Sequence, residues 1–302
     1  MLRALAVSFA IAMLAVSPGL CAAQATPPAV ESPNHDISTK QPNPQSNSAA
    51  GSSSGEDSAA ENELLEAANQ TRERAGAPPL RMDESLREAA RAHAQQMIAN
   101  GRLDHQFSGE PSLVQRIALV TPLDGAPTID RAGENVAYAT TAPEVNTALM
   151  HSPPHRENLL DTGFNVVGIA AIRSQGRLYV VQDFAHQIPS YSVEQSDKLV
   201  GRAVGEIRQQ AGLPKLVQLT PPNLDEAACL LAKESRPNAH LIATAYDNRR
   251  MITYTEGHPE VLPQAAVSML RDPGVRQFAV GACFARNAAY PTGTYWVAIL
   301  LY

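Results

Sequence analysis

The sequence predicts an α+β protein. Apolar residues recur at helical spacing in several segments between residues 61 and 160, and two runs of strand-forming residues, 164–172 and 178–184, follow them. The turn Ser174-Gln175-Gly176 joins these two runs into a hairpin. Because the helices come first and the hairpin comes last, we expect a sheet packed between helices.

The N-terminal residues have the composition of an export signal. Arg3 precedes an apolar run over residues 4–16, which is too short to span a bilayer comfortably, and small residues follow it. Leu20 before Cys21 disfavours a lipid anchor, so we expect simple cleavage of a signal peptide of residues 1–25. The mature protein is then expected to be secreted, either periplasmic or extracellular, with no transmembrane segment.

Composition divides the rest of the chain. Residues 26–60 are rich in Pro, Ser, Asn, Gln and Gly, which predicts a disordered linker. A chain of 302 residues has room for about two domains, and we place them at residues 61–188 and 195–302. The net charge is −6 and no basic stripe is visible, which argues against a nucleic-acid partner.

Helix signals order the first domain. One helix is expected to begin near Glu61 and to end before Gly76. A second is expected to begin at Asp83, which can cap it, and to stop at Asn100-Gly101. Further helices are expected over residues 113–119 and 143–150, with Pro153-Pro154 interrupting the chain before a short turn at 155–160.

Three polar residues in separate segments are the candidate site. His105 follows the second predicted helix, Glu134 lies in Gly133-Glu134-Asn135, read as a tight turn, and His155 begins a helical turn. Two imidazoles and a carboxylate can bind a divalent metal or transfer a proton. We expect the three side chains to converge in one polar cleft.

An ordered string of motifs resembles the CAP superfamily, which contains cysteine-rich secretory proteins, antigen five and plant pathogenesis-related proteins. The match covers residues 63–186 and is closest to the bacterial SCP-like branch. It is carried by Asn69-x-x-Arg72, Gly76, Pro79-Leu80, Leu86, Ala89, Ala94, Met97, His105, Gly133-Glu134-Asn135, Ser152-Pro153-x-His155-Arg156-x-Asn158-Leu159-Leu160 and Val167-Gly168-Ile169.

The resemblance implies a three-layer α-β-α sandwich with a central cleft lined by two histidines and two acidic residues. His105, His155 and Glu134 match three of these four positions. The fourth departs, because Ser152 stands where the family's second acid is expected and Leu149 stands where Trp is usual. A complete acid–base or metal tetrad is therefore not expected.

Three functions remain open. The first is a secreted binding protein that holds a small ligand, lipid or partner protein in the cleft. The second is a metal-dependent hydrolase, with zinc bound by His105, His155 and Glu134 and with Glu134 as ligand or general base. The third is a structural protein of the cell envelope, in which the same three residues form only a stabilising network.

Other polar residues near the site are given smaller roles. His151 precedes His155 by one helical turn, but Pro153-Pro154 makes a shared site doubtful. Ser108 and Ser152 lie near the histidines in sequence, yet no Gly-x-Ser-x-Gly motif supports a serine hydrolase. No role is assigned to the side chains expected to pack or face solvent, which are His93, Tyr138 and His186.

The C-terminal part repeats the first domain in weakened form, which predicts a degenerate CAP-like copy. The echoes pair residues 72–78 with 208–214, 86–90 with 224–228, 143–145 with 259–261, 164–172 with 275–284, and 178–184 with 295–301. No histidine corresponds to His105. Residues 255–258 are a weak counterpart of the Gly-Glu-Asn segment, and the His155 segment corresponds to 271–274. An unrelated small α+β domain is the rival interpretation.

Two cysteines remain after cleavage, Cys229 and Cys283, both in this C-terminal part. Export to an oxidising compartment favours a disulfide between them. Two buried thiols acting as small apolar residues are the alternative.

Overall fold

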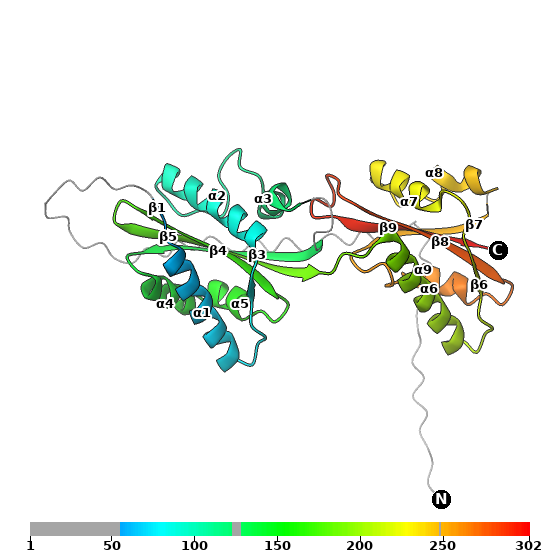
Figure 1. Ribbon diagram of the computed structural model, residues 1–302, viewed down its shortest axis with the longest axis horizontal. Helices are drawn as coiled ribbons and strands as arrows, with labels where there is room; N and C mark the ends of the chain where they lie inside the picture. The colour runs from blue at the N-terminus through cyan, green and yellow to red at the C-terminus, as the bar shows by residue number, and fades with distance from the viewer. Residues whose placement is uncertain (1–54, 123–127, 248) are drawn as a thin grey trace, which may run out of the picture.

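The computed structural model describes residues 55–122, 128–247 and 249–302, which form two units, each built on one sheet (Figure 1). The predicted signal peptide and the predicted linker up to residue 54 lie outside the described residues. The first helix begins at Ser58, slightly before the expected boundary at residue 61. No helix within the described ranges is long and apolar enough to cross a membrane.

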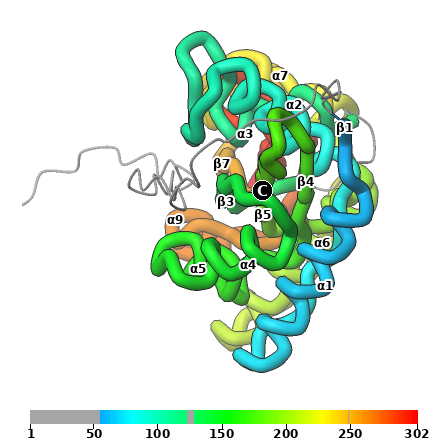
Figure 2. The backbone as a smooth tube through the Cα atoms, turned by 90° about the vertical axis from the view of Figure 1, so that its left-hand side faces the viewer, coloured from blue at the N-terminus to red at the C-terminus, as the bar shows by residue number. Residues whose placement is uncertain are grey.

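The first unit contains a five-stranded sheet of order β1-β4-β5-β3, with β2 parallel to β4. Its strands are β1 (Gly55–Glu56), β2 (Arg81–Met82), β3 (Thr128–Ala139), β4 (Val166–Ser174) and β5 (Arg177–Ile188). Its helices are α1 (Ser58–Arg74), α2 (Glu84–Asn100), α3 (Leu113–Val120), α4 (Ala142–His151) and α5 (Pro153–Leu160). Figure 2 shows α2 and α3 on one side of the strands, with α1, α4 and α5 on the other. The unit is an α+β, three-layer sandwich.

Close packing of α2 on the sheet fixes the position of the site. The N-cap Asp83 accepts a hydrogen bond from Leu86 N at 3.0 Å, and Gly101 ends the helix with φ 66°. A Cβ added to Gly168 of β4 would lie 2.1 Å from the carbonyl carbon of Leu86, so only glycine allows this approach. The loop that carries His105 follows this helix directly.

A buried arginine ties α1 to the far end of α5. Arg72 is fully buried, and its guanidinium donates to the carbonyls of Pro78 (2.7 Å), Leu159 (2.8 Å), Asp161 (2.9 Å) and Phe164 (3.1 Å). Backbone carbonyls, rather than a carboxylate, therefore satisfy this charge. The bonds to Leu159, Asp161 and Phe164 fix the end of α5, and with it His155, against α1 on the same face of the sheet.

The second unit has the strand order β6-β8-β9-β7, with β6 parallel to β8 and the other pairs antiparallel. Its strands are β6 (Val217–Leu219), β7 (Arg250–Glu256), β8 (Gln277–Ala285) and β9 (Thr294–Leu301). Its helices are α6 (Val193–Gln210), α7 (Leu224–Lys233), α8 (His240–Ala243), the 3₁₀ helix η1 (Thr244–Tyr246) and α9 (Gln264–Leu270). The order β2-β4-β5-β3 in the first unit has the same strand directions.

Two details of packing in the second unit match the first. Arg208 is fully buried and donates to the carbonyls of Pro214 (3.0 Å), Leu270 (3.0 Å) and Asp272 (2.8 Å). A Cβ on Gly281 would lie 2.4 Å from the carbonyl oxygen of Leu224, just as Gly168 faces Leu86. By these contacts α6, α7 and α9 take the places of α1, α2 and α5.

The two positions that form an ion pair in the first unit are both acidic in the second. Glu61 precedes Arg72 by eleven residues and pairs with Arg87 at 3.3 Å, and Asp197 and Asp225 stand at the matching positions. Burial and then the charge of Asp225 raise the pKa of Asp197 to about 7. The second unit therefore holds a carboxyl group that favours its protonated form.

Cys229 of α7 and Cys283 of β8 form a disulfide, with their Cα atoms 5.1 Å apart. The bond resolves the alternative left open by the sequence, and it joins a helix to the central part of the second sheet. Closing a loop across 54 residues restricts the unfolded chain substantially.

Replacing both Cys229 and Cys283 by Ala should lower the free energy of unfolding of the second unit by about 2–5 kcal/mol. Urea denaturation followed by amide resonances of each unit measures this loss. We expect the first unit to keep the wild-type stability, and an unchanged midpoint for the second unit would contradict the entropic role of the bond.

Asp197→Asn should stabilise the second unit more at pH 8 than at pH 4.5. The favourable contribution of protonated Asp197 is fully present below the ordinary Asp pKa near 4 and is lost as the pH rises through about 7. Thermal unfolding at the two pH values measures the difference. Glu206→Gln, on the exposed face of the same helix, is the matched control, and an equal effect at both pH values would refute the assignment.

Candidate functional site

The structure brings His105, Glu134 and His155 together from a loop, a strand and a helix. His105 lies in the loop after α2, and its Nδ1 is 2.9 Å from Glu134 Oε1. His155 lies in the first turn of α5, and its ring centroid is 6.4 Å from that of His105, with the planes inclined by 34°. The two imidazoles and the carboxylate therefore share one site.

Glu134 lies in the middle of β3, so the prediction that Gly133-Glu134-Asn135 forms a tight turn was wrong. Glycine is required at position 133 for a different reason. A Cβ there would approach the Phe164 ring at 3.0 Å and Asn158 Oδ1 at 3.3 Å. The missing side chain leaves room for α5 and the residues that follow it to pack against the strand.

Both oxygens of Glu134 have a cationic or hydrogen-bonding partner. Oε1 faces His105, and Oε2 forms a short ion pair with Arg116 of α3, whose side chain is almost fully buried. Burial acts to raise the pKa of Glu134, but the His105 hydrogen bond and the charges of His93 and Arg116 outweigh it, so the pKa lies below its ordinary value. Glu134 is an ionised carboxylate held in a buried site.

His93 belongs to the same network, although the sequence had suggested no role for it. It is fully buried, its Nδ1 lies 2.7 Å from Glu110 Oε1, and its Nε2 lies 2.8 Å from the carbonyl oxygen of Asp104. The carbonyl can only accept, so Nε2 carries a proton, and a second proton is shared between Nδ1 and Glu110. A histidine within the alanine-rich apolar face of α2 was the available sequence signal.

Asp183 is a second carboxyl group that sequence reasoning missed. It is fully buried on β5, directly opposite Glu134 in the strand register. Burial, followed by the negative charge of Glu134, raises the pKa of Asp183 well above its ordinary value. The strand pair therefore sets a protonated carboxyl beside an ionised one. An acid in the apolar run Val180-Val181-Gln182-Asp183-Phe184 was the sequence signal.

Amides from the sheet and α5 fix the backbone around His155. Asn135 Nδ2 donates to the carbonyl of His155 at 3.0 Å and to Gln182 Oε1 at 3.2 Å. Asn158 Nδ2 donates to the carbonyl of Glu134 and to Asn135 Oδ1, both at 3.1 Å. This buried set links β3, β5 and α5, so the relative position of Glu134 and His155 is constrained from both sides.

Solvent reaches the network mainly at His105, whose side chain is 26% exposed compared with 4% for Glu134. Because Nδ1 faces Glu134, Nε2 is the nitrogen left for an external partner. No Ser or Thr hydroxyl hydrogen-bonds His105 within the part of the chain that the structure describes. Ser152 is buried at the junction of α4 and α5, and Ser108 is exposed.

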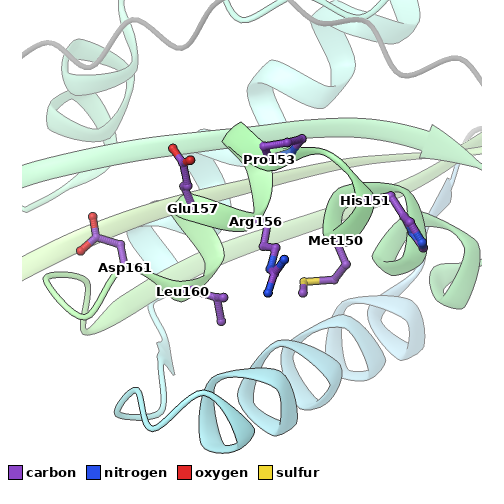
Figure 3. A pocket seen from close by; sticks show the side chains of 7 residues that line it. All are labelled: Met150, His151, Pro153, Arg156, Glu157, Leu160 and Asp161. Carbon is purple, nitrogen blue, oxygen red and sulfur yellow. The ribbon is translucent and has the colours of Figure 1, made fainter.

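His151 does not join this site. Its Nδ1 lies 2.7 Å from the carbonyl of Thr147, and its side chain lines a separate groove of about 450 Å³ on α4 and α5. Figure 3 shows the groove residues, with Arg156, Met150 and Leu160 directed towards the neighbouring helix. The groove is lined by Met150, His151, Pro153, Arg156, Glu157, Leu160 and Asp161. Outside the site, His186 pairs with Asp130 at 2.8 Å.

The arrangement does not fit a zinc site made by His105, His155 and Glu134. Arg116 occupies the position beside Glu134 Oε2 that a bound cation would need, and its own charge would repel a divalent ion. Among residues 55–122, 128–247 and 249–302, no group of three or more His, Cys, Asp or Glu side chains is placed to hold a metal ion.

The register of the second sheet identifies the residues at the matching positions. Gly168 pairs with Asp183, which pairs with Glu134, whereas Gly281 pairs with Ala298, which pairs with Thr253. Ala266 precedes Leu270 by four residues, as His155 precedes Leu159. Ala298, Thr253 and Ala266 thus replace Asp183, Glu134 and His155. Residues 255–258 and 271–274, suggested from sequence, are not at these positions.

The sequence of the first unit matches a known protein family. Residues 65–184 match the model of the CAP family, described as the cysteine-rich secretory protein family. A relative, YkwD of Bacillus subtilis (strain 168), is 33% identical over 120 residues, covering 39% of this chain and 44% of that protein. The chain thus matches less than half of the length of this relative.

Solved structures were also compared. An outer surface protein of Borrelia burgdorferi has a TM-score of 0.41 at 20% identity, covering 45% of this chain and 99% of that chain. An extracellular SCP-domain protein of Bacillus anthracis str. Ames has a TM-score of 0.37 at 22% identity, covering 43% and 41%. The sequence match identifies a CAP, or cysteine-rich secretory protein, domain at residues 65–184, which make up less than half of the chain.

Proposed function

We propose that this chain is an exported CAP-domain protein that binds a small ligand bearing an acidic group at the cleft of its first unit. The proposal rests on the different surroundings of the two ring nitrogens of His105. Glu134 fixes one nitrogen of His105 and leaves the other for an external partner, while the imidazole of His155 lies beside it. The partly exposed imidazole of His105, with the buried imidazole of His155 close to it, favours an acceptor such as a carboxylate or phosphate.

The charges behind the imidazoles support this choice of ligand. Glu134 is balanced by Arg116, and Glu110 by the proton it shares with His93. Asp183 adds no charge while it is protonated. With these negative charges balanced, Nε2 of His105 is the exposed ring nitrogen that remains for the ligand.

Hydrolysis is disfavoured by the same contacts. A covalent mechanism needs a nucleophile within hydrogen-bond reach of an imidazole, and a metal mechanism needs an open cation position. In the described ranges no hydroxyl bonds His105, and Arg116 fills the cation position beside Glu134. Binding requires neither feature.

The second unit, by the same proposal, is a degenerate copy of the first that has lost the site. Its strand order, its buried Arg208 and its Gly281 contact support a common origin. Thr253, Ala266 and Ala298 at the matching positions leave no imidazole or buried carboxyl there. Only the first unit is then expected to bind the ligand.

Inorganic phosphate is a simple probe of the cleft. Calorimetry at pH 5.5 should show weak binding, with a Kd of about 1 mM, that is lost in His105→Ala. His186→Ala is the matched control, since His186 also pairs with a carboxylate but lies outside the cleft, and it should bind as wild type. A titration with zinc should show no binding that depends on His105.

The outcomes separate the alternatives. Submicromolar zinc binding that disappears in His105→Ala would replace the proposal with a metal-dependent enzyme. Equal phosphate binding by wild type and His105→Ala, together with a loss of stability in the variant, would leave only a structural network.

The two facing carboxyls should have opposite effects on stability. Glu134→Gln leaves Arg116 buried without a counter-charge and should cost about 3–5 kcal/mol at neutral pH. The Glu134 contribution is present above its ordinary pKa and is lost as the pH falls through the lower folded value. Asp183→Asn removes a group favourable only while protonated, so the variant should gain on wild type as the pH rises.

Chemical denaturation between pH 3 and pH 8 measures both effects, because the Glu134 contribution is lost only below the ordinary Glu pKa. Glu63→Gln, on the exposed face of α1, serves as a control for a general loss of negative charge. If Glu134→Gln and Asp183→Asn changed stability in the same direction across this range, the assignment of one ionised and one protonated carboxyl would be wrong.

A further inference from the structure

The second unit contacts the first at the two elements that supply Arg116 and Glu134. α3 carries Arg116, and β3 carries Glu134. Arg286 follows β8 of the second unit, and Thr292 precedes β9. The contacts made by these two residues define a path from the second unit to the site.

Arg286 binds the C-terminal end of α3. Its Nη1 donates to the carbonyls of Thr121 (2.9 Å) and Ala118 (3.4 Å), and its Nη2 donates to the carbonyl of Pro122 (2.8 Å). Carbonyls at the end of a helix lack partners within the helix and carry the negative end of its dipole. A guanidinium with several donors satisfies both needs at once, so it holds the end of α3 in one place.

Thr292 binds the start of β3. Its buried hydroxyl donates to the carbonyl of Ile129 at 2.8 Å. The pairing of β3 with β5 shifts register between Ile129 and Arg131, so the bonded carbonyl lies beside this irregularity. A fixed partner at that point sets how the strand enters the sheet, five residues before Glu134.

The one charged side chain of α3, Arg116, connects this helix to the site. Besides its ion pair with Glu134, Arg116 Nη1 donates to the carbonyls of His105 and Pro111, each at 3.4 Å. A displacement of α3 would therefore move the cation away from Glu134 and loosen the loop that carries His105. Arg116 precedes the three carbonyls that Arg286 binds by two, five and six residues.

We propose that the second unit is a built-in positioning module for the cleft, in which Arg286 and Thr292 hold α3 and β3 so that Arg116 meets Glu134. Arg286 is a positioning residue, because its hydrogen bonds go to the C-terminal end of α3 and not to His105. This role gives a function to the second unit, in which Thr253, Ala266 and Ala298 stand in place of the site residues. It concerns the Arg116–Glu134 contact and stands apart from whether the cleft binds an acidic ligand.

The test is the exchange of the Arg116 guanidinium protons, measured by ¹⁵N NMR on the full chain without ligand. In Arg286→Ala, these protons should exchange about tenfold faster than in wild type, because the ion pair opens more often. Arg286→Lys, which keeps a cation at the end of α3 but loses the fork of donors, should fall between the two. Thr292→Val should also speed exchange, by a smaller factor.

Two controls separate positioning from general destabilisation. Arg249→Ala removes an exposed arginine that stacks on Tyr302 within the second unit. Replacing Cys229 and Cys283 by Ala destabilises that unit without removing either contact residue. Both should leave Arg116 exchange at the wild-type rate.

The proposal is overturned if Arg116 exchange is unchanged in Arg286→Ala while the first unit keeps its native amide spectrum. It is also overturned if the disulfide variant accelerates exchange as much as Arg286→Ala does, because stability alone would then explain the effect. If Arg286→Ala does not fold, Thr292→Val decides in the same way. None of these readings depends on phosphate or zinc.

Discussion

The site depends on one buried carboxylate. Glu134 lies on a strand, nearly closed off from water, and remains ionised because His105 and Arg116 each occupy one of its oxygens. An unpaired carboxylate at this depth would take up a proton instead. Because burying this charge is costly, three elements depend on one another. The His105 loop, α3 and β3 must all be in place before the carboxylate has its partners. His93 and Glu110 extend the same requirement to α2.

The scaffold supplies this precision through backbone contacts rather than through further ion pairs. Arg72 fixes the end of α5 by three carbonyl bonds, and Gly168 lets α2 lie directly on the sheet. The same two devices recur as Arg208 and Gly281 in the second unit, where no charged site needs support. They therefore belong to the construction of the sandwich and do not depend on the charged site. The second unit can therefore keep the fold without the site, as its proposed role in positioning α3 and β3 requires.

The sequence predicted the features that local pattern controls. Helix boundaries followed Asp83 and Gly101, the hairpin followed Gln175-Gly176, and the motifs around His105, Glu134 and His155 indicated the family. The turn assigned to Gly133 was wrong because a glycine needed for close packing looks, in sequence, like a glycine needed for a bend. Asp183, His93 and Glu110 were missed because their roles depend on which strand or loop lies opposite. Arg116 was missed for the same reason: nothing in its helix distinguishes a buried arginine from a solvated one.

Proton positions in the cleft test this account most directly, and neutron diffraction from a deuterated crystal of the full chain would locate them. We expect deuterium on Nδ1 of His105 directed at Glu134, none on either oxygen of Glu134, deuterium on the carboxyl of Asp183, and Arg116 in contact with Glu134. A deuterium on Glu134 with none on Asp183, or an Arg116 side chain turned away from the carboxylate, would contradict it.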